Sequence, residues 1–434
     1  MKRLETAVNG SERHEESLVG KRLVPATVVA AVFAFAVGQL NFGLALDHPQ
    51  LWRAALALVI LSGITPLIYA VNLRIVPVFS RRTWPSPRLL PAAILASLAG
   101  GWLVYLGRAT FVEPLEILGS TAALLGGIHF LAAIMRLFRS PAKGGPAPPL
   151  PFPEQAAIDR IGTRFMGLAG VYLLFGLAVG LLLTFWTPQT GRWELVWAHA
   201  MLLGWFLTMA AGVCYHVLPR WASVRWSSAR RIRAHLYLVE GGLPLMILAL
   251  ALNLRWLFFV AGPIQTVAVL LFIWNILPAA LALPRVTRLG LAGAALMLGI
   301  GVSIGASMAM DPVRHAILRQ SHAEINVFGW TGLLISSIGY YLFPRFAGQP
   351  LRWPRLGYVQ LAALALGVAT SAPAWWWYLS FDPGARWLIL AGSLLSTGSF
   401  ALFGLNLAAT FYGSRQGLTR VTLQPRTASS SRGG

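Results

Sequence analysis

Two histidines near the starts of two long apolar stretches have the chemistry to bind a metal. His199 lies in AHAMLLGWFLTMAAGVCYHVLPRW (198–221), and His322 lies in SHAEINVFGWTGLLISSIGYYLFPRF (321–346). A neutral imidazole is a good ligand for haem iron and for copper. If both stretches are helices that enter a membrane from the same side, their imidazoles can face each other across one metal centre. The alternative is a pair of interfacial histidines that meet water or lipid headgroups.

The two stretches repeat more than the histidine. Each has a Gly-Trp pair, and ten residues after that tryptophan comes a tyrosine, Tyr215 or Tyr340. A Pro-Arg pair follows fourteen and fifteen residues after the tryptophan in both stretches. When the tryptophans are matched, Glu324 takes the place of His199, so both stretches are polar at this depth. The repetition predicts two helices of the same tilt that are related by a pseudo-rotation.

Glu324 is a candidate of a different kind. It lies two residues after His322, so the two side chains point about 200° apart around a helix and are not expected to bind the same metal. Polar groups inside a membrane are costly and suggest function by default. Two roles fit Glu324: a carboxylate near the surface that pairs with Arg314 or Arg319, or a group that transfers protons or supports the metal ligands.

Further candidates lie at other depths. His129 lies deep in the fourth apolar run, as either a hydrogen-bonded core histidine or a further metal ligand. His216 follows His199 by seventeen residues, about 25 Å along a helix, so the two cannot share one ion. His216 and its neighbour Tyr215 are predicted near the cytoplasmic surface. They are interfacial residues there or, together with Tyr340, part of a proton path.

The composition defines the elements that must position these side chains. Of the 434 residues, 56% are hydrophobic and only 11% are charged, and the mean hydropathy is +0.65. Apolar runs of about 20 residues, the length that crosses a bilayer, recur along the whole chain. The sequence therefore predicts an all-α polytopic membrane helix bundle. The single cysteine, Cys214, excludes an internal disulfide and a thiolate metal cage.

The distribution of basic residues predicts the topology. Alternate loops and both tails hold 28 of the 35 Lys and Arg residues, and the remaining loops hold seven. This bias predicts that both termini are cytoplasmic. It also accounts for the net charge of +21 without a nucleic-acid partner. The twelve predicted spans are 24–46, 53–73, 88–107, 114–137, 165–186, 194–218, 236–254, 256–281, 289–310, 321–343, 356–379 and 387–412.

The spans divide the chain into five parts. The first apolar run continues to Leu46, so we expect a membrane anchor there rather than a cleaved signal peptide. A segment rich in Pro and Gly separates the first four helices from the following eight. The predicted parts are a cytoplasmic tail at 1–22, helices 1–4 in 23–138, a cytoplasmic linker at 139–164, helices 5–12 in 165–412 and a disordered cytoplasmic tail at 413–434.

The two stretches, with their leading histidine and Gly-Trp pair, resemble helices of haem–copper oxidase subunit I, and most of all its divergent oxidase-like and NnrS-type relatives. The resemblance implies twelve helices in a bacterial-type inner (plasma) membrane. It implies haem b and possible copper, and of the two histidines only His322 matches the family's helix 10 position in outline. From the residues themselves we expect His199 and His322 to be the ligands, with His129 as the most plausible further metal ligand. Besides the lipid bilayer, the implied partner is a diatomic gas or an electron donor. The implied function is electron transfer or the handling of O2 or NO, and an enzyme of this kind is an oxidoreductase.

The chain also departs from this family. The oxidases carry an adjacent His-His pair and a His-x-His on helix 10, and the chain has neither. Its second span contains no histidine, and the nearest one, His48, lies just before the span begins. The NWTG sequence associated with NnrS is absent. We therefore expect a relative with one haem or one metal rather than a dinuclear oxidase. The alternatives are a transporter or channel, disfavoured because few Asp, Glu, Asn or Gln lie in the spans, and a non-catalytic membrane subunit with a decayed metal site.

Overall fold

The fold is a bundle of membrane-spanning helices. The structure, a computed structural model, describes residues 22–142, 150–186, 190–222 and 228–413. Within these residues all regular secondary structure is helical, and twelve helices are long and apolar enough to cross a membrane. The predicted fold class and the predicted number of spans are therefore confirmed. The predicted tails at 1–22 and 413–434 lie almost wholly outside the described residues.

Nine of the twelve spans are uninterrupted α-helices. Some of the turns between them are short; at the end of α10, for example, Asn253 adopts a left-handed conformation (φ 54°) and the chain turns directly into the next helix. Asparagine tolerates this conformation better than most residues. The nine helices are α2 (Val24–Leu44), α5 (Leu90–Thr110), α6 (Glu113–Arg139), α7 (Gln155–Leu182), α10 (Ala229–Leu252), α11 (Arg255–Leu281), α12 (Arg285–Met310), α15 (Pro354–Ser380) and α16 (Arg386–Tyr412).

The second, sixth and tenth spans each contain a π-helical segment. In a π-helical turn the backbone bonds from residue i to i+5, and such turns are frequent at functional sites. The second span is α3 (Gln50–Leu58), η2 (Val59–Ile64) and α4 (Thr65–Ser80). The sixth is α8 (Thr190–His199), η4 (Ala200–Leu207) and α9 (Thr208–Ala222). The tenth is α13 (Arg319–Glu324), η6 (Ile325–Trp330) and α14 (Thr331–Ala347).

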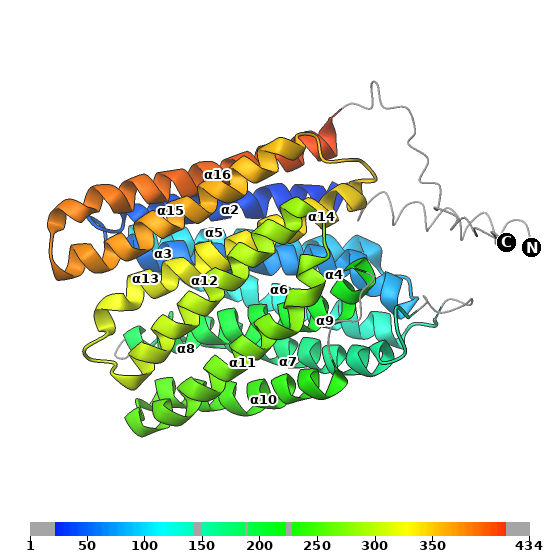
Figure 1. Cartoon of the computed structure of the whole chain (residues 1–434), viewed down its shortest axis with the longest axis horizontal. Coiled ribbons are helices and arrows are strands. Elements are labelled where there is room, and N and C mark those ends of the chain that lie inside the picture. Colours follow the sequence, from blue (N-terminus) through cyan, green and yellow to red (C-terminus); the bar gives the residue numbers. More distant parts are fainter. Residues whose placement is uncertain (1–21, 143–149, 187–189, 223–227, 414–434) are drawn as a thin grey trace, which may run out of the picture.

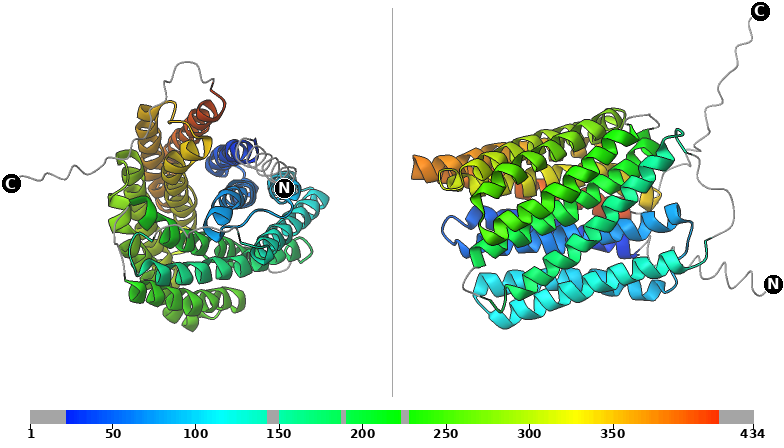
Figure 2. Two further views of the ribbon diagram at one scale, coloured as in Figure 1. Left: turned by 90° about the vertical axis from the view of Figure 1, so that its right-hand side faces the viewer. Right: turned by 90° about the horizontal axis from the view of Figure 1, so that it is seen from below.

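These three spans are the inner helices of the bundle, and we call them the inner spans. Of the most apolar stretch of each, 89%, 72% and 89% is buried, against 33–61% for the other nine. The other helices surround them, and α16 packs against α2 to close the ring (Figure 2). The core of the molecule therefore lies where the three inner spans meet.

The two ends of the bundle differ in what they carry. Helix α2 begins and α16 ends at the same end, which we call the terminal face (Figure 1). Helices α8 and α13, which hold the two leading histidines, begin at the opposite end, the far face (Figure 1). An even number of spans requires this arrangement. That the terminal face is cytoplasmic stays a prediction.

The largest departure from the predicted boundaries lies at the start of the fifth helix. Helix α7 begins at Gln155, ten residues before the predicted start of the fifth helix, so the linker predicted at 139–164 is shorter. The first turns of α7 carry charged residues such as Asp159, which end an apolar run without ending a helix. Their apolar side is buried nonetheless, at Ile158 and Ile161. A hydropathy pattern misses such an amphipathic extension because it averages both sides of the helix.

Candidate functional site

Each π-helical segment of the inner spans is followed directly by a threonine. These are Thr65 after η2, Thr208 after η4 and Thr331 after η6. In the sixth and tenth spans the threonine hydroxyl donates to the carbonyl five residues earlier, Leu203 O at 2.8 Å and Asn326 O at 2.9 Å. The hydroxyl thereby adds a hydrogen bond to the widened turn, and the same device recurs in both spans.

The threonines reveal how the two histidines correspond. His199 lies nine residues before Thr208, and His322 lies nine residues before Thr331. Matching the spans by threonine pairs the two histidines, whereas matching them by tryptophan does not. In the second span the same position is Leu56, so this span offers no imidazole. The sequence contained this spacing, but it becomes meaningful only when the π-helical segments are known.

The two leading histidines come together near the far face. Their imidazoles lie close enough to interact electrostatically, and both are half-buried. His199 Nδ1 lies 2.8 Å from Leu195 O, and His322 Nδ1 lies 3.0 Å from Gly301 O of α12. A carbonyl only accepts hydrogen bonds, so Nδ1 carries the proton and Nε2 keeps a lone pair. No described residue bonds to either Nε2 atom, which is the arrangement that ligating histidines adopt.

Helix α12 leaves room for the His322 ring. A Cβ at Gly305 would lie 2.9 Å from His322 Cε1, and a Cβ at Gly301 would lie 2.5 Å from Asn326 Nδ2. Asn326 Nδ2 in turn donates to His322 O at 2.8 Å. The imidazole therefore fits against α12 because both positions are glycine, and these contacts hold it in one orientation.

Glu324 lies on another side of its helix and faces α2 and α15. It is fully buried, and its Oε1 accepts hydrogen bonds from Gln39 Nε2 at 3.2 Å and from Ser371 Oγ. No charged side chain among the described residues bonds to it. The structure therefore does not show the suggested pairing with Arg314 or Arg319. The predicted direction, away from His322 on the helix, agrees with the structure, in which His322 faces α12 instead.

His129 lies apart from the two leading histidines. Its Nε2 is 2.9 Å from Leu89 O, which directly precedes α5 at the terminal face. Among the described residues, no three His, Cys, Asp or Glu side chains are grouped closely enough to hold a metal ion. The structure thus places His199 and His322 near the far face and His129 against Leu89, away from both.

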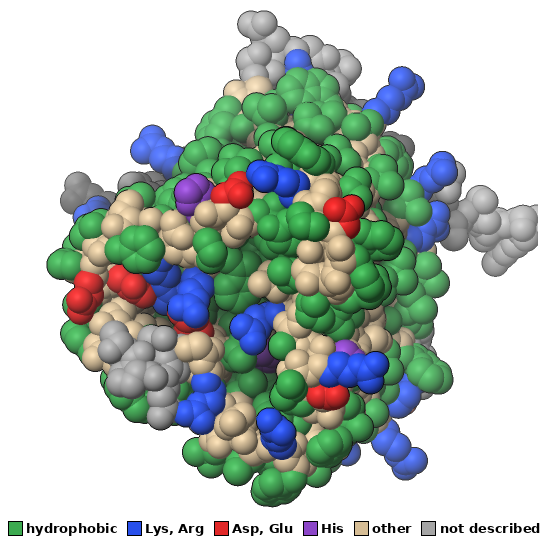
Figure 3. Space-filling model, turned by 90° about the vertical axis from the view of Figure 1, so that its left-hand side faces the viewer, with side chains coloured by type: hydrophobic (Ala, Val, Ile, Leu, Met, Phe, Trp, Pro, Cys, Tyr) green, Lys and Arg blue, Asp and Glu red, His purple; other side chains and the backbone are tan. Residues whose placement is uncertain are grey.

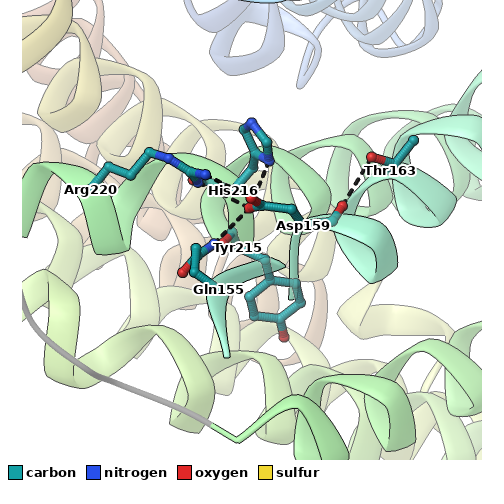
Figure 4. Close-up of polar contacts among 6 residues, drawn as sticks. All are labelled: Gln155, Asp159, Thr163, Tyr215, His216 and Arg220. Atoms are coloured by element: carbon teal, nitrogen blue, oxygen red, sulfur yellow. Dashed lines mark hydrogen bonds and ion pairs between the residues drawn. The ribbon is translucent and has the colours of Figure 1, made fainter. Parts of the chain in front are cut away.

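Asp159 of α7 gathers three partners near the terminal face (Figure 4). Arg220 donates to both carboxylate oxygens, at 2.9 Å and 2.6 Å. His216 Nδ1 lies 2.9 Å from Oδ1, and Gln155 Nε2 donates to the same oxygen at 2.7 Å. The network connects α7 to α9. His216 therefore belongs to an ion-pair cluster near the end of the bundle, far from the metal-binding candidates.

The two repeat tyrosines also lie in the terminal half of the bundle. The Tyr215 hydroxyl lies 2.8 Å from His235 Nδ1 and accepts from Asn275 Nδ2 at 3.2 Å. Tyr340 packs edge-on against Phe403, with 5.0 Å between ring centroids. The tyrosines hold matching places in the repeat but face different helices, α10 and α11 in one case and α16 in the other. A part for them in a proton path stays a prediction.

The far face above the two leading histidines is hollowed and charged. Figure 3 shows Lys or Arg and His side chains within the hollow. Glu194, five residues before His199, pairs with Arg53 at 3.0 Å, and Arg108 pairs with Glu116 at 2.7 Å. Five residues correspond to about 8 Å along a helix. The candidate site thus lies just beneath a polar surface.

An apolar pocket of about 130 Å³ lies where the three inner spans meet. Its lining comes from α4, α9 and α14 and from the adjoining ends of η2 and η4, so it lies on the terminal side of the π-helical segments. Asn72 is the only lining side chain with an amide, a hydroxyl or a charge, and its Nδ2 donates to Ile68 O at 2.9 Å. Phe206, which lines the pocket, packs against Trp330 with 4.9 Å between ring centroids.

Comparison with known proteins identifies the fold. No family model and no curated protein matches the sequence. By contrast, 21 chains of solved structures match. One belongs to a haem–copper terminal oxidase dimer solved by cryo-EM, with a TM-score of 0.67 and 13% identity over 92% of this chain and 84% of that chain. The chain is therefore a multi-pass membrane protein with an oxidase-like fold, whereas the NnrS-type likeness stays a prediction.

Proposed function

We propose that the protein binds haem b between His199 and His322 and transfers electrons or handles O2 or NO near the far face. The observation that supports this most is the pair of Nδ1–carbonyl hydrogen bonds, which leaves both Nε2 lone pairs available to iron. When bound, the haem supplies a redox-active iron. Leu195 O and Gly301 O fix which nitrogen of each imidazole carries the proton, so the Nε2 atoms of His199 and His322 would be the atoms that hold it.

Two imidazoles suit haem iron better than a copper ion. The porphyrin supplies the equatorial ligands, so the iron needs only two axial ligands from the protein. A copper ion held by side chains takes further ligands, such as the third donor of a His₂Cys site. The described residues provide no third His, Cys, Asp or Glu at this place. Copper bound by the two histidines and a small molecule is therefore the second candidate.

We further propose that the far face is the outer side of a bacterial-type inner (plasma) membrane. The support is the four-to-one distribution of Lys and Arg between alternate loops, 28 to seven. A reporter that is active only outside the cytoplasm should be active when it is fused after Arg255, at the far face. The same reporter should be inactive when it is fused after Arg288, at the terminal face. The opposite pattern would overturn the orientation and leave the haem proposal in place.

The absorption spectrum of the purified protein, oxidised and then reduced with dithionite, tests the haem proposal. We expect a Soret band and, on reduction, sharp α and β bands in the wild type. His199→Ala and His322→Ala should each lose these bands. His129→Ala, which changes a histidine that bonds to Leu89 O instead, is the matched control and should keep them. A colourless wild type, or bands that persist in both variants, would contradict the proposal.

A further inference from the structure

The apolar pocket between the inner spans has the dimensions of a binding site for a small molecule. Its volume of about 130 Å³ is close to the roughly 150 Å³ of an engineered protein cavity that binds benzene or xenon, but this pocket is partly open whereas that cavity is closed. All three inner spans contribute to it, so it lies at the centre of the bundle. Its walls include the only cysteine of the chain, Cys214.

Water is expected to bind weakly in this pocket. A buried water needs about two to four polar partners. Asn72 is the only lining amide, and its Nδ2 already donates to Ile68 O, so the main polar groups left in the lining are Asn72 Oδ1 and the indole N–H of Trp221. An apolar guest gives up no hydrogen bonds when it enters and gains dispersion contacts with the walls. The chemistry of the lining therefore selects a small, neutral, apolar ligand.

We propose that this pocket binds such a molecule and that its guest in the membrane is a diatomic gas, O2 or NO. Both gases are small and apolar, and both dissolve in lipid. The choice of a gas rests on the proposed function, in which the haem site handles one. The binding of an apolar guest does not depend on that function.

The pocket lies close to the two leading histidines but is separated from them. Phe206 follows His199 by seven residues, about 10 Å along the helix. Its ring lines the pocket and packs against Trp330, which is not part of the lining. The pocket thus holds the gas beside the proposed iron site rather than on it.

Cys214 makes the pocket measurable in the intact protein. Methyl methanethiosulfonate is a small thiol reagent, and the chain's sole cysteine gives a single mass change. In nanodiscs we expect Cys214 to react, and saturating benzene to slow the reaction several-fold. Ala210→Phe, which places a ring in the pocket, should slow the reaction similarly and abolish the effect of benzene. Leu125→Phe, on the exposed side of α6, is the matched control and should behave as the wild type.

Two results would overturn the pocket as a binding site. One is a reaction rate that neither benzene nor Ala210→Phe changes. The other is a folded protein whose Cys214 reacts only after denaturation. If Ala210→Phe does not fold, a wild-type structure determined under xenon pressure decides instead: xenon in the pocket supports the proposal, and its absence there refutes it.

The assignment of the guest as a gas has its own measurement. In the haem-containing protein, NO would bind the reduced haem by displacing one of the two imidazoles. Ala210→Phe should slow this displacement several-fold and leave the absorption spectrum recorded without NO unchanged. Leu125→Phe should do neither. An unchanged NO rate in Ala210→Phe would overturn the gas assignment alone. A wild type without haem would refute the proposed function and the gas assignment together, whereas the Cys214 result would stand.

Discussion

The sixth and tenth spans share their backbone design and differ in what orients their histidines. Both carry a π-helical segment, a following threonine and a histidine nine residues before it. His199 Nδ1 donates within its own helix, to Leu195 O, whereas His322 Nδ1 donates to Gly301 O of α12. Local geometry therefore orients the first imidazole, and tertiary packing orients the second. We infer that packing changes displace His322 more easily than His199.

The Pro-Arg pairs at the other ends of these spans show the same contrast. Arg220 donates to His216 O, and Arg345 donates to Tyr341 O at 2.5 Å, so each arginine bonds the carbonyl four residues earlier. Arg220 also binds Asp159 of α7 through two hydrogen bonds. The Arg345 guanidinium instead lies over the ring of Tyr341, 3.5 Å from its centroid. The repeat thus keeps the local contact and varies the tertiary one.

The largest stability effect should come from the arginine with the tertiary partner. Arg220→Ala leaves a mostly buried carboxylate, Asp159, without its two-pronged partner, which costs about 3 kcal/mol. Arg345→Ala loses a hydrogen bond and a cation–π contact, which together cost about 1 kcal/mol. Unfolding of both variants in the same detergent measures the difference. Equal losses would show that the two Pro-Arg ends are energetically equivalent.

Crowding the His322 ring from α12 should have the next largest effect. Gly305→Ala forces a Cβ to within 2.9 Å of His322 Cε1, and such overpacking costs about 1–3 kcal/mol. We expect a lower haem content per protein. Gly299→Ala on the same helix is the matched control, because nothing lies within 4 Å of its added Cβ. A Gly305→Ala protein with the haem content and stability of the wild type would contradict the packing account of His322.

The smallest effects should come from the threonines that follow the π-helical segments. Thr208→Val and Thr331→Val each lose a hydrogen bond to the widened turn, at a cost of about 1 kcal/mol. Thr65→Val should cost close to nothing, because within the described part of the chain the Thr65 hydroxyl has no hydrogen-bond partner. A comparison of the three variants in one unfolding assay checks this. If Thr65→Val loses as much unfolding free energy as the other two variants, the hydrogen bond of the threonine hydroxyl does not account for the stabilisation.

The features that could be predicted from the sequence are those that depend on hydropathy and on the repeat. Each span must cross the same apolar layer, so the twelve runs and the common end of α2 and α16 followed from the pattern. The repeat predicted that His199 and His322 could face each other, and the structure places the helices that carry them with their starts at the same face. Their role as ligands stays a prediction.

Other parts of the site depend on contacts that a sequence pattern does not contain. Glu324 bonds to Gln39, 285 residues away, because the ring of helices closes on itself. His129 bonds to a backbone carbonyl, and a carbonyl has no sequence signature. The π-helical segments differ from α-helix only in their hydrogen-bond register, and the residues in them are ordinary apolar ones. The His–Thr spacing therefore had no visible meaning before the fold was known.

We propose that two imidazoles from the two repeat helices hold one haem. Haem content per chain, combined with the electron paramagnetic resonance spectrum of the oxidised protein, tests it most directly. We predict one haem per chain and a low-spin signal of the kind that two imidazole ligands give. Each of the single variants His199→Ala and His322→Ala should lose this signal. A wild type without haem, or a low-spin signal that persists in the double variant His199→Ala/His322→Ala, would contradict it.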